Sequence, residues 1–379
     1  MKKKLDQYLK FMLQKNASDL HIKALSGIRV RIDGVLTNFG QEKFSKTQME
    51  RLVEEITDVS QLGALQRDKS IDFSYKIEDN ESRFRVNIFH QIDGLSAVFR
   101  AIPEEIPQIV HLNLPKSIET FADVPRGLIL VTGVTGSGKS TTLASLVDLI
   151  NQKQKRHIIT IEDPIEFVHK DKNSFINQRA IGIDANSFKD ALRSALREDP
   201  DVILVGEMRD LETIEIAINA ANTGHLVFST LHTLSAKDTI DRIIGMFPND
   251  EQNRVRLSLA AVLEGVISQR LLPTMEGSIR IPAVEVMKKS ARIADLIATA
   301  RDSEILDAIE EGRKIYGMQS FDQSILDLFL KGKITEDIAL EYATSRSDMK
   351  LSISKISDKA ASAGSDIVDF KDDEEEQGA

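Results

Sequence analysis

Residues 127–150 read GLILVTGVTGSGKSTTLASLVDLI, which is an apolar run, a glycine-rich loop and an amphipathic run in direct succession. The loop from Gly133 to Ser140 matches the pattern G-x-x-x-x-G-K-[ST] in full, and the flanking runs predict a strand before it and a helix after it. Glycines let consecutive N–H groups turn inward around phosphates, and the helix N-terminus adds its dipole. The stretch therefore predicts a nucleotide-phosphate site in an α/β domain.

Two side chains of this loop have expected roles in binding ATP. Lys139 is expected to neutralise the β- and γ-phosphates, and Ser140 is expected to hold Mg²⁺. The confirming context is the strand–loop–helix order, since the pattern alone occurs by chance in unrelated turns.

Two further apolar runs end in acids. VILVG at residues 202–206 is followed by Glu207, and HIITI at residues 157–161 is followed by Glu162. Because ligands of open α/β sheets collect at the carboxyl ends of the strands, both acids are expected in the same crevice as the phosphate loop. Glu207 is expected to reach Mg²⁺ through water or to act as a base. The alternative is that both acids only cap their strands.

A third apolar run, LVFSTL, lies between His225 and His232. A strand would separate the two rings by ~20 Å, which is too far for them to share one zinc ion. His232 stands at the carboxyl end and is the better candidate for a contact with the γ-phosphate. Two structural histidines at the ends of a buried strand are the alternative.

A hairpin before residue 101 carries several arginines. A two-residue turn at Asp93–Gly94 would place Asn87 opposite Arg100, and strand alternation puts Arg83, Arg85, Asn87 and Arg100 on one face. Like charges on one face repel unless an anion lies among them. We expect a nucleotide bound where two domains meet to be that anion, with a solvated face as the alternative.

Composition narrows the class of protein. The 379 residues predict two domains, and the absence of cysteine excludes disulfides, iron–sulfur clusters and thiolate-bound zinc. The net charge of −10 lies largely in the last residues, where seven acids from Asp366 onward face only Lys371. The remaining chain has no basic excess, so no nucleic-acid partner is expected. No apolar run approaches the ~20 residues of a membrane span, which predicts a cytoplasmic protein.

Four parts are expected along the chain. Alternating strands and helices predict a small α+β domain over residues 1–101, and prolines mark a linker at 102–114. Continuous apolar strands separated by helices predict a parallel sheet covered on both faces over 115–345, turning mostly helical beyond Asn253. Residues 346–379 are expected to form a disordered acidic tail.

Together these segments resemble the type II/IV secretion ATPase superfamily. The loop, IEDPIEF at 161–167, VILVGE at 202–207 and TGHLVFSTLHT at 223–233 are similar to the Walker A, Asp box, Walker B and His box of that family. The similarity extends from NASDLHI near residue 16 to about residue 351. Without a long N-terminal domain or a four-cysteine insertion, the chain resembles the type IV pilus retraction ATPases. ARIADLI at 291–297, where retraction motors usually carry AIRNLI, is closer to their accessory paralogue.

The resemblance implies a fold and a set of roles. The fold is α/β, with a small PAS-like α+β domain followed by a RecA-like P-loop ATPase domain that has a helical C-terminal part. Glu207 would be the catalytic acid or base and a metal contact with Ser140, Glu162 would orient the attacking water, and His232 would sense the γ-phosphate. Arg85 and Arg100 would clamp the nucleotide. The nucleotide-binding residues would be Gly133, Val134, Thr135, Gly136, Ser137, Gly138, Lys139, Ser140 and Thr141.

The same resemblance implies an ATP- and Mg²⁺-dependent motor that retracts a pilus and so drives twitching motility. Its expected partners are five further copies of the chain in a homo-hexamer, a platform protein of the inner membrane, at whose cytoplasmic face it would act, and a paralogous retraction ATPase. No zinc is expected. Three alternatives stay open: a pilus-assembly or type II secretion ATPase, a nucleotide-gated structural subunit with little turnover, and a RecA-like nucleic-acid motor.

Overall fold

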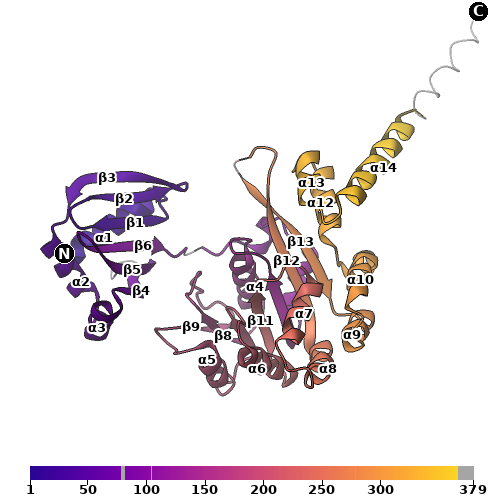
Figure 1. Ribbon diagram of the computed structural model, residues 1–379, viewed down its shortest axis with the longest axis horizontal. Helices are drawn as coiled ribbons and strands as arrows, with labels where there is room; N and C mark the ends of the chain where they lie inside the picture. Colours follow the sequence, from indigo (N-terminus) through magenta and orange to yellow (C-terminus); the bar gives the residue numbers. More distant parts are fainter. Residues whose placement is uncertain (78–81, 104, 278, 366–379) are drawn as a thin grey trace, which may run out of the picture. The chain divides into compact units, whose positions relative to one another are not determined.

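The computed structural model describes residues 1–77, 82–103, 105–277 and 279–365. The chain divides into two compact units (Figure 1). The first is built on residues 1–106, with the short segments 164–169 and 182–184 grouped with it, and the second comprises the remaining residues.

The first unit is a six-stranded antiparallel sheet with the order β3-β2-β1-β6-β5-β4 (Figure 1). Apolar residues at every second strand position form one face, which packs with helical side chains such as Leu9 and Leu52 into a single core. Reciprocal capping boxes, Ser45 with Gln48 and Asp58 with Gln61, begin two of the helices. The elements are α1 (Lys2–Gln14), β1 (Asp19–Lys23), β2 (Gly27–Ile32), β3 (Val35–Lys43), α2 (Lys46–Ile56), α3 (Val59–Asp68), β4 (Ser70–Lys76), β5 (Arg83–Gln91) and β6 (Gly94–Ala101).

The two predicted hairpins have different outcomes. The Asp33–Gly34 turn is confirmed, because Ile32 pairs with Val35. The predicted register of the second hairpin is wrong: Gln91 pairs with Gly94, so Ile92 and Asp93 form the turn. Gly94, with φ of +122°, closes this turn and starts β6.

This change of register brings Arg85, in place of Asn87, directly opposite Arg100. A shift of two positions leaves every side chain on its face, so the shared polar face of Arg83, Arg85, Asn87 and Arg100 is retained.

The second unit contains a seven-stranded sheet with the order β13-β12-β7-β11-β10-β8-β9. All neighbouring pairs are parallel except β12–β13. Every residue of β7 and β11 is buried, as expected for strands covered on both faces. The strands are β7 (Gly127–Thr132), β8 (His157–Glu162), β9 (Phe175–Ala180), β10 (Val202–Val205), β11 (Leu226–Leu231), β12 (Leu263–Pro273) and β13 (Arg280–Lys288).

Helices cover both faces of this sheet (Figure 1). On one face lie α4 and two short 3₁₀ helices, and on the other lie α5 to α10. The bounds are η1 (Ile109–His111), η2 (Lys116–Asp123), α4 (Lys139–Lys153), α5 (Phe188–Ala195), α6 (Leu211–Asn222), α7 (Ala236–Gly245), α8 (Gln252–Val262), α9 (Ala291–Ala298), η3 (Asp302–Glu304) and α10 (Ile305–Glu311).

The predicted, mostly helical segment beyond Asn253 is wrong in part, because β12 and β13 lie within it. Both strands are buried along most of their length, so their residues lack the alternation that distinguishes a strand from a helix. Strands β1 and β9 were also not predicted from the sequence.

The C-terminal helices pack on the ends of β12 and β13. They are α11 (Arg313–Tyr316), α12 (Phe321–Leu330), α13 (Glu336–Tyr342) and α14 (Arg346–Ser365). The predicted disordered tail from residue 346 is therefore wrong for its first part, since Met349 and Ile353 of α14 are buried against α12 and α13. Its last part, residues 366–379, lies outside the described residues. Within the part of the chain that the structure describes, no helix is long and apolar enough to span a membrane.

Candidate nucleotide site

The glycine-rich loop joins Thr132, the last residue of β7, to Lys139, the first residue of α4. Gly133, Gly136 and Gly138 have φ angles of +138°, +79° and +93°, which L-residues rarely adopt. At Gly133 a Cβ atom would also lie 2.4 Å from the carbonyl oxygen of Gln269. The loop therefore needs glycine both for its backbone conformation and for its close approach to β12.

The side chains of this loop fit a phosphate ligand. The Lys139 ammonium is buried and donates to the carbonyl oxygens of Gly133 at 2.8 Å and Val134 at 3.1 Å, so the charge lies at the loop. The Ser137 hydroxyl is buried without a hydrogen-bond partner. Gly138 at the N-cap provides no side-chain cap for the first N–H groups of α4. Open donors and a fixed positive charge are what nucleotide phosphates require.

Glu162 is the last residue of β8, two strands away from β11 in the sheet. Its Oε1 atom accepts a hydrogen bond from Thr160 at 2.6 Å and another from the amide of Gln178 at 3.3 Å. Two donors on one oxygen orient this carboxylate at the end of the strand.

Glu207 follows β10 and lies between two basic side chains. Its Oε2 atom is 2.8 Å from Nη2 of Arg209, and its Oε1 atom is 3.2 Å from Nε2 of His232. The hydrogen bond and charge of Glu207 raise the pKa of Arg209 above its usual value. His232 follows β11, the neighbour of β10, so the parallel pairing brings the two residues together.

His225 lies at the opposite end of β11 from His232. Its Nδ1 atom is 2.9 Å from the carbonyl oxygen of Ala220, at the end of α6. This placement is that of a structural histidine.

The predicted clamp arginines belong to the first unit, where carboxylates already contact them. Arg100 Nε donates to Asp19 Oδ1 at 2.7 Å, and Arg85 Nε lies 3.7 Å from Asp72 Oδ1. Burial alone would raise the pKa of Asp19, but hydrogen bonds from Ser18 and Arg100, with the charge of Arg100, hold it below its usual value. Aspartates therefore balance part of the charge that the sequence analysis assigned to nucleotide.

Residues 1–363 match the family model described as Type II/IV secretion system protein. The chain belongs to this family.

Two relatives and one solved structure show which members of the Type II/IV secretion system family it resembles. The type IV pilus retraction ATPase PilT of Pseudomonas aeruginosa is 44% identical over 339 residues, which are 89% of this chain and 98% of PilT. The type IV pilus ATPase PilU of the same organism is 35% identical over 355 residues, 92% of this chain and 91% of PilU. The crystal structure of the pilus retraction motor PilT with bound ADP superposes with a TM-score of 0.84 at 42% identity, covering 90% and 98% of the two chains.

These matches confirm three predictions. The family is the one predicted, the α/β fold class with its N-terminal α+β unit and P-loop domain is shared with PilT, and the chain is an ATPase of this family. A nucleotide ligand is likewise supported by the ADP in the PilT structure.

Several partners of the predicted residues were not predicted from the sequence. Arg209 stands two positions after Glu207, and its basic side chain beside the acid was an available signal. Asp19 lies in the quoted segment NASDLHI, but its pairing with Arg100 requires the sheet order β1–β6. Gln178 had no signal, because β9 was not predicted.

The residues present also fit Mg²⁺. Ser140 and Glu207 offer hydroxyl and carboxylate oxygens, which this ion prefers, and it commonly takes its other ligands from nucleotide phosphates and water. Among the described residues, no group of three or more histidine, aspartate or glutamate side chains forms a metal cluster by itself. A shared protein–nucleotide site agrees with both observations.

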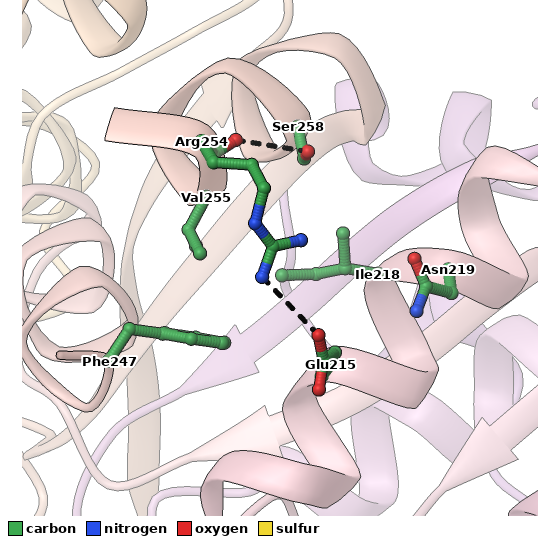
Figure 2. A pocket seen from close by; sticks show the side chains of 7 residues that line it. All are labelled: Glu215, Ile218, Asn219, Phe247, Arg254, Val255 and Ser258. Carbon is green, nitrogen blue, oxygen red and sulfur yellow. Dashed lines mark hydrogen bonds and ion pairs between the residues drawn. The ribbon is translucent and has the colours of Figure 1, made fainter. Parts of the chain in front are cut away.

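A small cavity elsewhere in the second unit is separate from this site. It lies between α6 and α8, where Arg254 Nη2 is 3.4 Å from Glu215 Oε1 (Figure 2). None of the predicted nucleotide residues lines it. Its lining residues are Glu215, Ile218, Asn219, Phe247, Arg254, Val255 and Ser258.

Proposed function

We propose that this chain is a motor that couples ATP hydrolysis to retraction of type IV pili and so drives twitching motility. The observation that carries the proposal is the pairing of a complete phosphate loop with the Glu207–His232 contact at neighbouring strand ends, in a chain that aligns with nearly all of PilT. Alignment over the whole relative matters, because the activity of a motor depends on both units and not on the P-loop alone.

The residues of the site divide the work of hydrolysis. Lys139 and the N-terminus of α4 bind the phosphates, with the residues from Gly133 to Thr141 around them. Ser140 and Glu207 would hold Mg²⁺, which when bound neutralises charge on the phosphate oxygens. Glu162, which accepts hydrogen bonds from Thr160 and Gln178, would orient the attacking water.

Glu207 and His232 have linked roles in this proposal. Glu207 accepts the proton of the water, and His232 reports the γ-phosphate to it through their contact at 3.2 Å. Arg85 and Arg100 would add charge to the phosphates from the first unit, as arginines supplied from outside a P-loop do in other phosphoryl-transfer enzymes.

The proposal also includes an oligomeric state and a cellular location. We infer a homo-hexamer that acts at the cytoplasmic face of the inner membrane on a polytopic platform protein. The support is the resemblance to retraction ATPases over almost the whole chain. Cross-linking followed by mass measurement of the purified protein with and without ATP tests the stoichiometry.

Cells that lack every retraction motor provide the functional test. Expression of this chain alone is expected to restore fibre retraction and surface motility, whereas the Lys139→Ala variant is expected to restore neither. Steady-state hydrolysis of ATP by the purified protein helps to distinguish the alternative functions. Hydrolysis without restored retraction in any background would favour an assembly or secretion ATPase, and ATP binding with negligible hydrolysis would favour a nucleotide-gated subunit.

One observation favours a second candidate, an accessory motor that retracts pili only beside a paralogous ATPase. The segment ARIADLI, which forms most of α9, is closer in sequence to the accessory paralogue than to the AIRNLI segment of retraction motors. Retraction in cells that retain the paralogue, but not in cells without it, would establish this role.

A further inference from the structure

Strand β12 holds both ends of the phosphate loop. At the first end, the Thr132 hydroxyl donates to the Ser268 hydroxyl at 2.9 Å, and both side chains are fully buried. At the second end, the Gln269 amide donates to the Thr142 hydroxyl of α4 at 3.0 Å. Two consecutive residues of one strand therefore contact the residue that precedes the loop and the helix that follows it.

The backbone of β12 touches the loop as well. The carbonyl oxygen of Gln269 occupies the space next to Gly133, where it leaves no room for a Cβ atom. Gln269 thus contacts the loop through its main chain and α4 through its side chain. This places it in a position to set the separation between the start of the loop and the start of the helix.

A second, independent observation is that two polar groups at this place are unsatisfied. The Oε1 atom of Gln269 is buried without a hydrogen-bond partner, and so is the nearby Ser137 hydroxyl, which also lies against Gly133. The side chains of both residues are almost completely excluded from solvent. Buried polar groups without partners are rare, and they recur where a ligand or an ordered water completes the site.

We propose that Gln269 is a positioning residue of the phosphate loop, which ties β12 to Thr142 so that the loop is held ready for nucleotide phosphates. The inference deepens the proposed function and rests on it. Gln269 is not proposed to touch the nucleotide; it acts through Thr142 and Gly133. Loss of this hydrogen bond is expected to lower the affinity for nucleotide phosphates and to leave the loop less ordered. Both effects can be measured without ATP hydrolysis.

The decisive comparison is between two substitutions at Thr142. Thr142→Ser keeps the hydroxyl, whereas Thr142→Val has nearly the same shape and removes it. In the full-length protein, titration with a fluorescent ADP analogue is expected to show wild-type affinity for the serine variant and an affinity lower by ~5-fold or more for the valine variant. Gln269→Leu should weaken binding by a similar factor, and the double variant should be no weaker than the worse single variant.

Amide hydrogen exchange of the free protein supplies a readout without nucleotide. Exchange across residues 133–142 is expected to be faster in Thr142→Val than in Thr142→Ser. Arg270 is the matched control on the same strand. Its side chain points the other way, with the guanidinium 4.0 Å from the Phe321 ring and Nη1 near the carbonyl oxygen of Tyr342. Arg270→Gln should leave ADP affinity within about twofold of wild type.

Equal ADP affinity in folded Thr142→Val and Thr142→Ser variants would overturn the proposal. So would losses that multiply in the double variant, because independent effects add in free energy. If Gln269→Leu fails to fold, the Thr142 pair still decides. Failure of the proposed function has a different signature, since the wild-type protein would then bind ADP without retracting pili.

Discussion

The Nε2 atom of His232 lies 3.2 Å from Oε1 of Glu207, while Arg209 occupies the other oxygen of the same carboxylate. The carboxylate is only 18% exposed, so these two basic groups are its main partners in the described structure. Glu207 can therefore respond to the nucleotide only if Arg209 or His232 leaves it and binds a phosphate or a water instead. The contact therefore joins the residues that follow the ends of β10 and β11.

Glu207→Gln is expected to bind ATP but to hydrolyse it at least ~100-fold more slowly, because the amide keeps the shape and loses the proton acceptor. Glu162→Gln should be slower than wild type by a smaller factor. Steady-state phosphate release and ATP titration measure the two effects. Glu215→Gln, the same chemical change beside the cavity of Figure 2, is the control and should be fully active. Wild-type turnover in both site variants would reduce these acids to strand caps.

Lys139→Ala should abolish hydrolysis and leave the fold intact. The ammonium donates to carbonyl oxygens of the loop and packs against no apolar core, so its main contribution is charge on bound phosphate. Hydrolysis and far-ultraviolet circular dichroism check the two halves of this expectation. Lys237→Ala on the exposed side of α7 provides the control. Near-normal turnover in Lys139→Ala would mean that ATP binds elsewhere.

Alanine variants of the two predicted clamp arginines, Arg85 and Arg100, should differ from each other in stability but not in activity. Arg100→Ala removes the nearest cation from buried Asp19 and is expected to cost about 1–2 kcal/mol of unfolding free energy. Arg85→Ala loses only an exposed contact with Asp72, so its cost should be below about 0.5 kcal/mol. Both variants should lose most ATP turnover. Denaturant unfolding and hydrolysis of the full-length variants give the comparison, and unchanged turnover in the double variant would refute the clamp.

Glu285 should make stability depend on pH. It is buried and accepts a hydrogen bond from the Ala236 N–H at the start of α7; burial raises its pKa from 4.5 to about 7. Between these values the native state holds a proton that the unfolded chain has released, so stability falls as pH rises, by about 3 kcal/mol in total.

Glu285→Gln is neutral at every pH and should lack this part of the decline. The difference in unfolding free energy between variant and wild type should therefore shift in favour of the variant between pH 5 and pH 8, by up to about 3 kcal/mol. Denaturant titrations at the two pH values measure it, with exposed Glu276→Gln as the control. Parallel pH profiles for wild type and Glu285→Gln would contradict the expectation.

Removal of residues 366–379 should leave hydrolysis and thermal stability unchanged, because the segment is strongly acidic with little to bury. Removal from residue 346 onward is the contrasting truncation. It deletes Met349 and Ile353 from the core with α12 and α13, so a lower melting temperature is expected. If the shorter deletion abolishes retraction in cells but not hydrolysis in vitro, the acidic segment docks on a partner.

The phosphate loop and the strand-end acids were readable in the chain itself. Glycine conformations, a lysine at a fixed spacing and an acid directly after an apolar run are local features, so a short stretch specifies each of them. The polar face of the arginines was readable for the same reason, since alternation along one strand places Arg83 and Arg85 together.

Which distant residues contact each other was decided only by the tertiary structure. Arg100 contacts Asp19, which lies 81 positions away in the sequence, and Gln269 contacts Thr142, which lies 127 positions away. Both contacts depend on which strands are neighbours in the sheet, and no local pattern reveals that order. Strands β12 and β13 were hidden because burial on both faces removes the alternation by which a strand is recognised. Burial of Met349 likewise turned part of an expected tail into a packed helix. These outcomes depend on long-range packing, which a chain acquires only when its distant segments share one core.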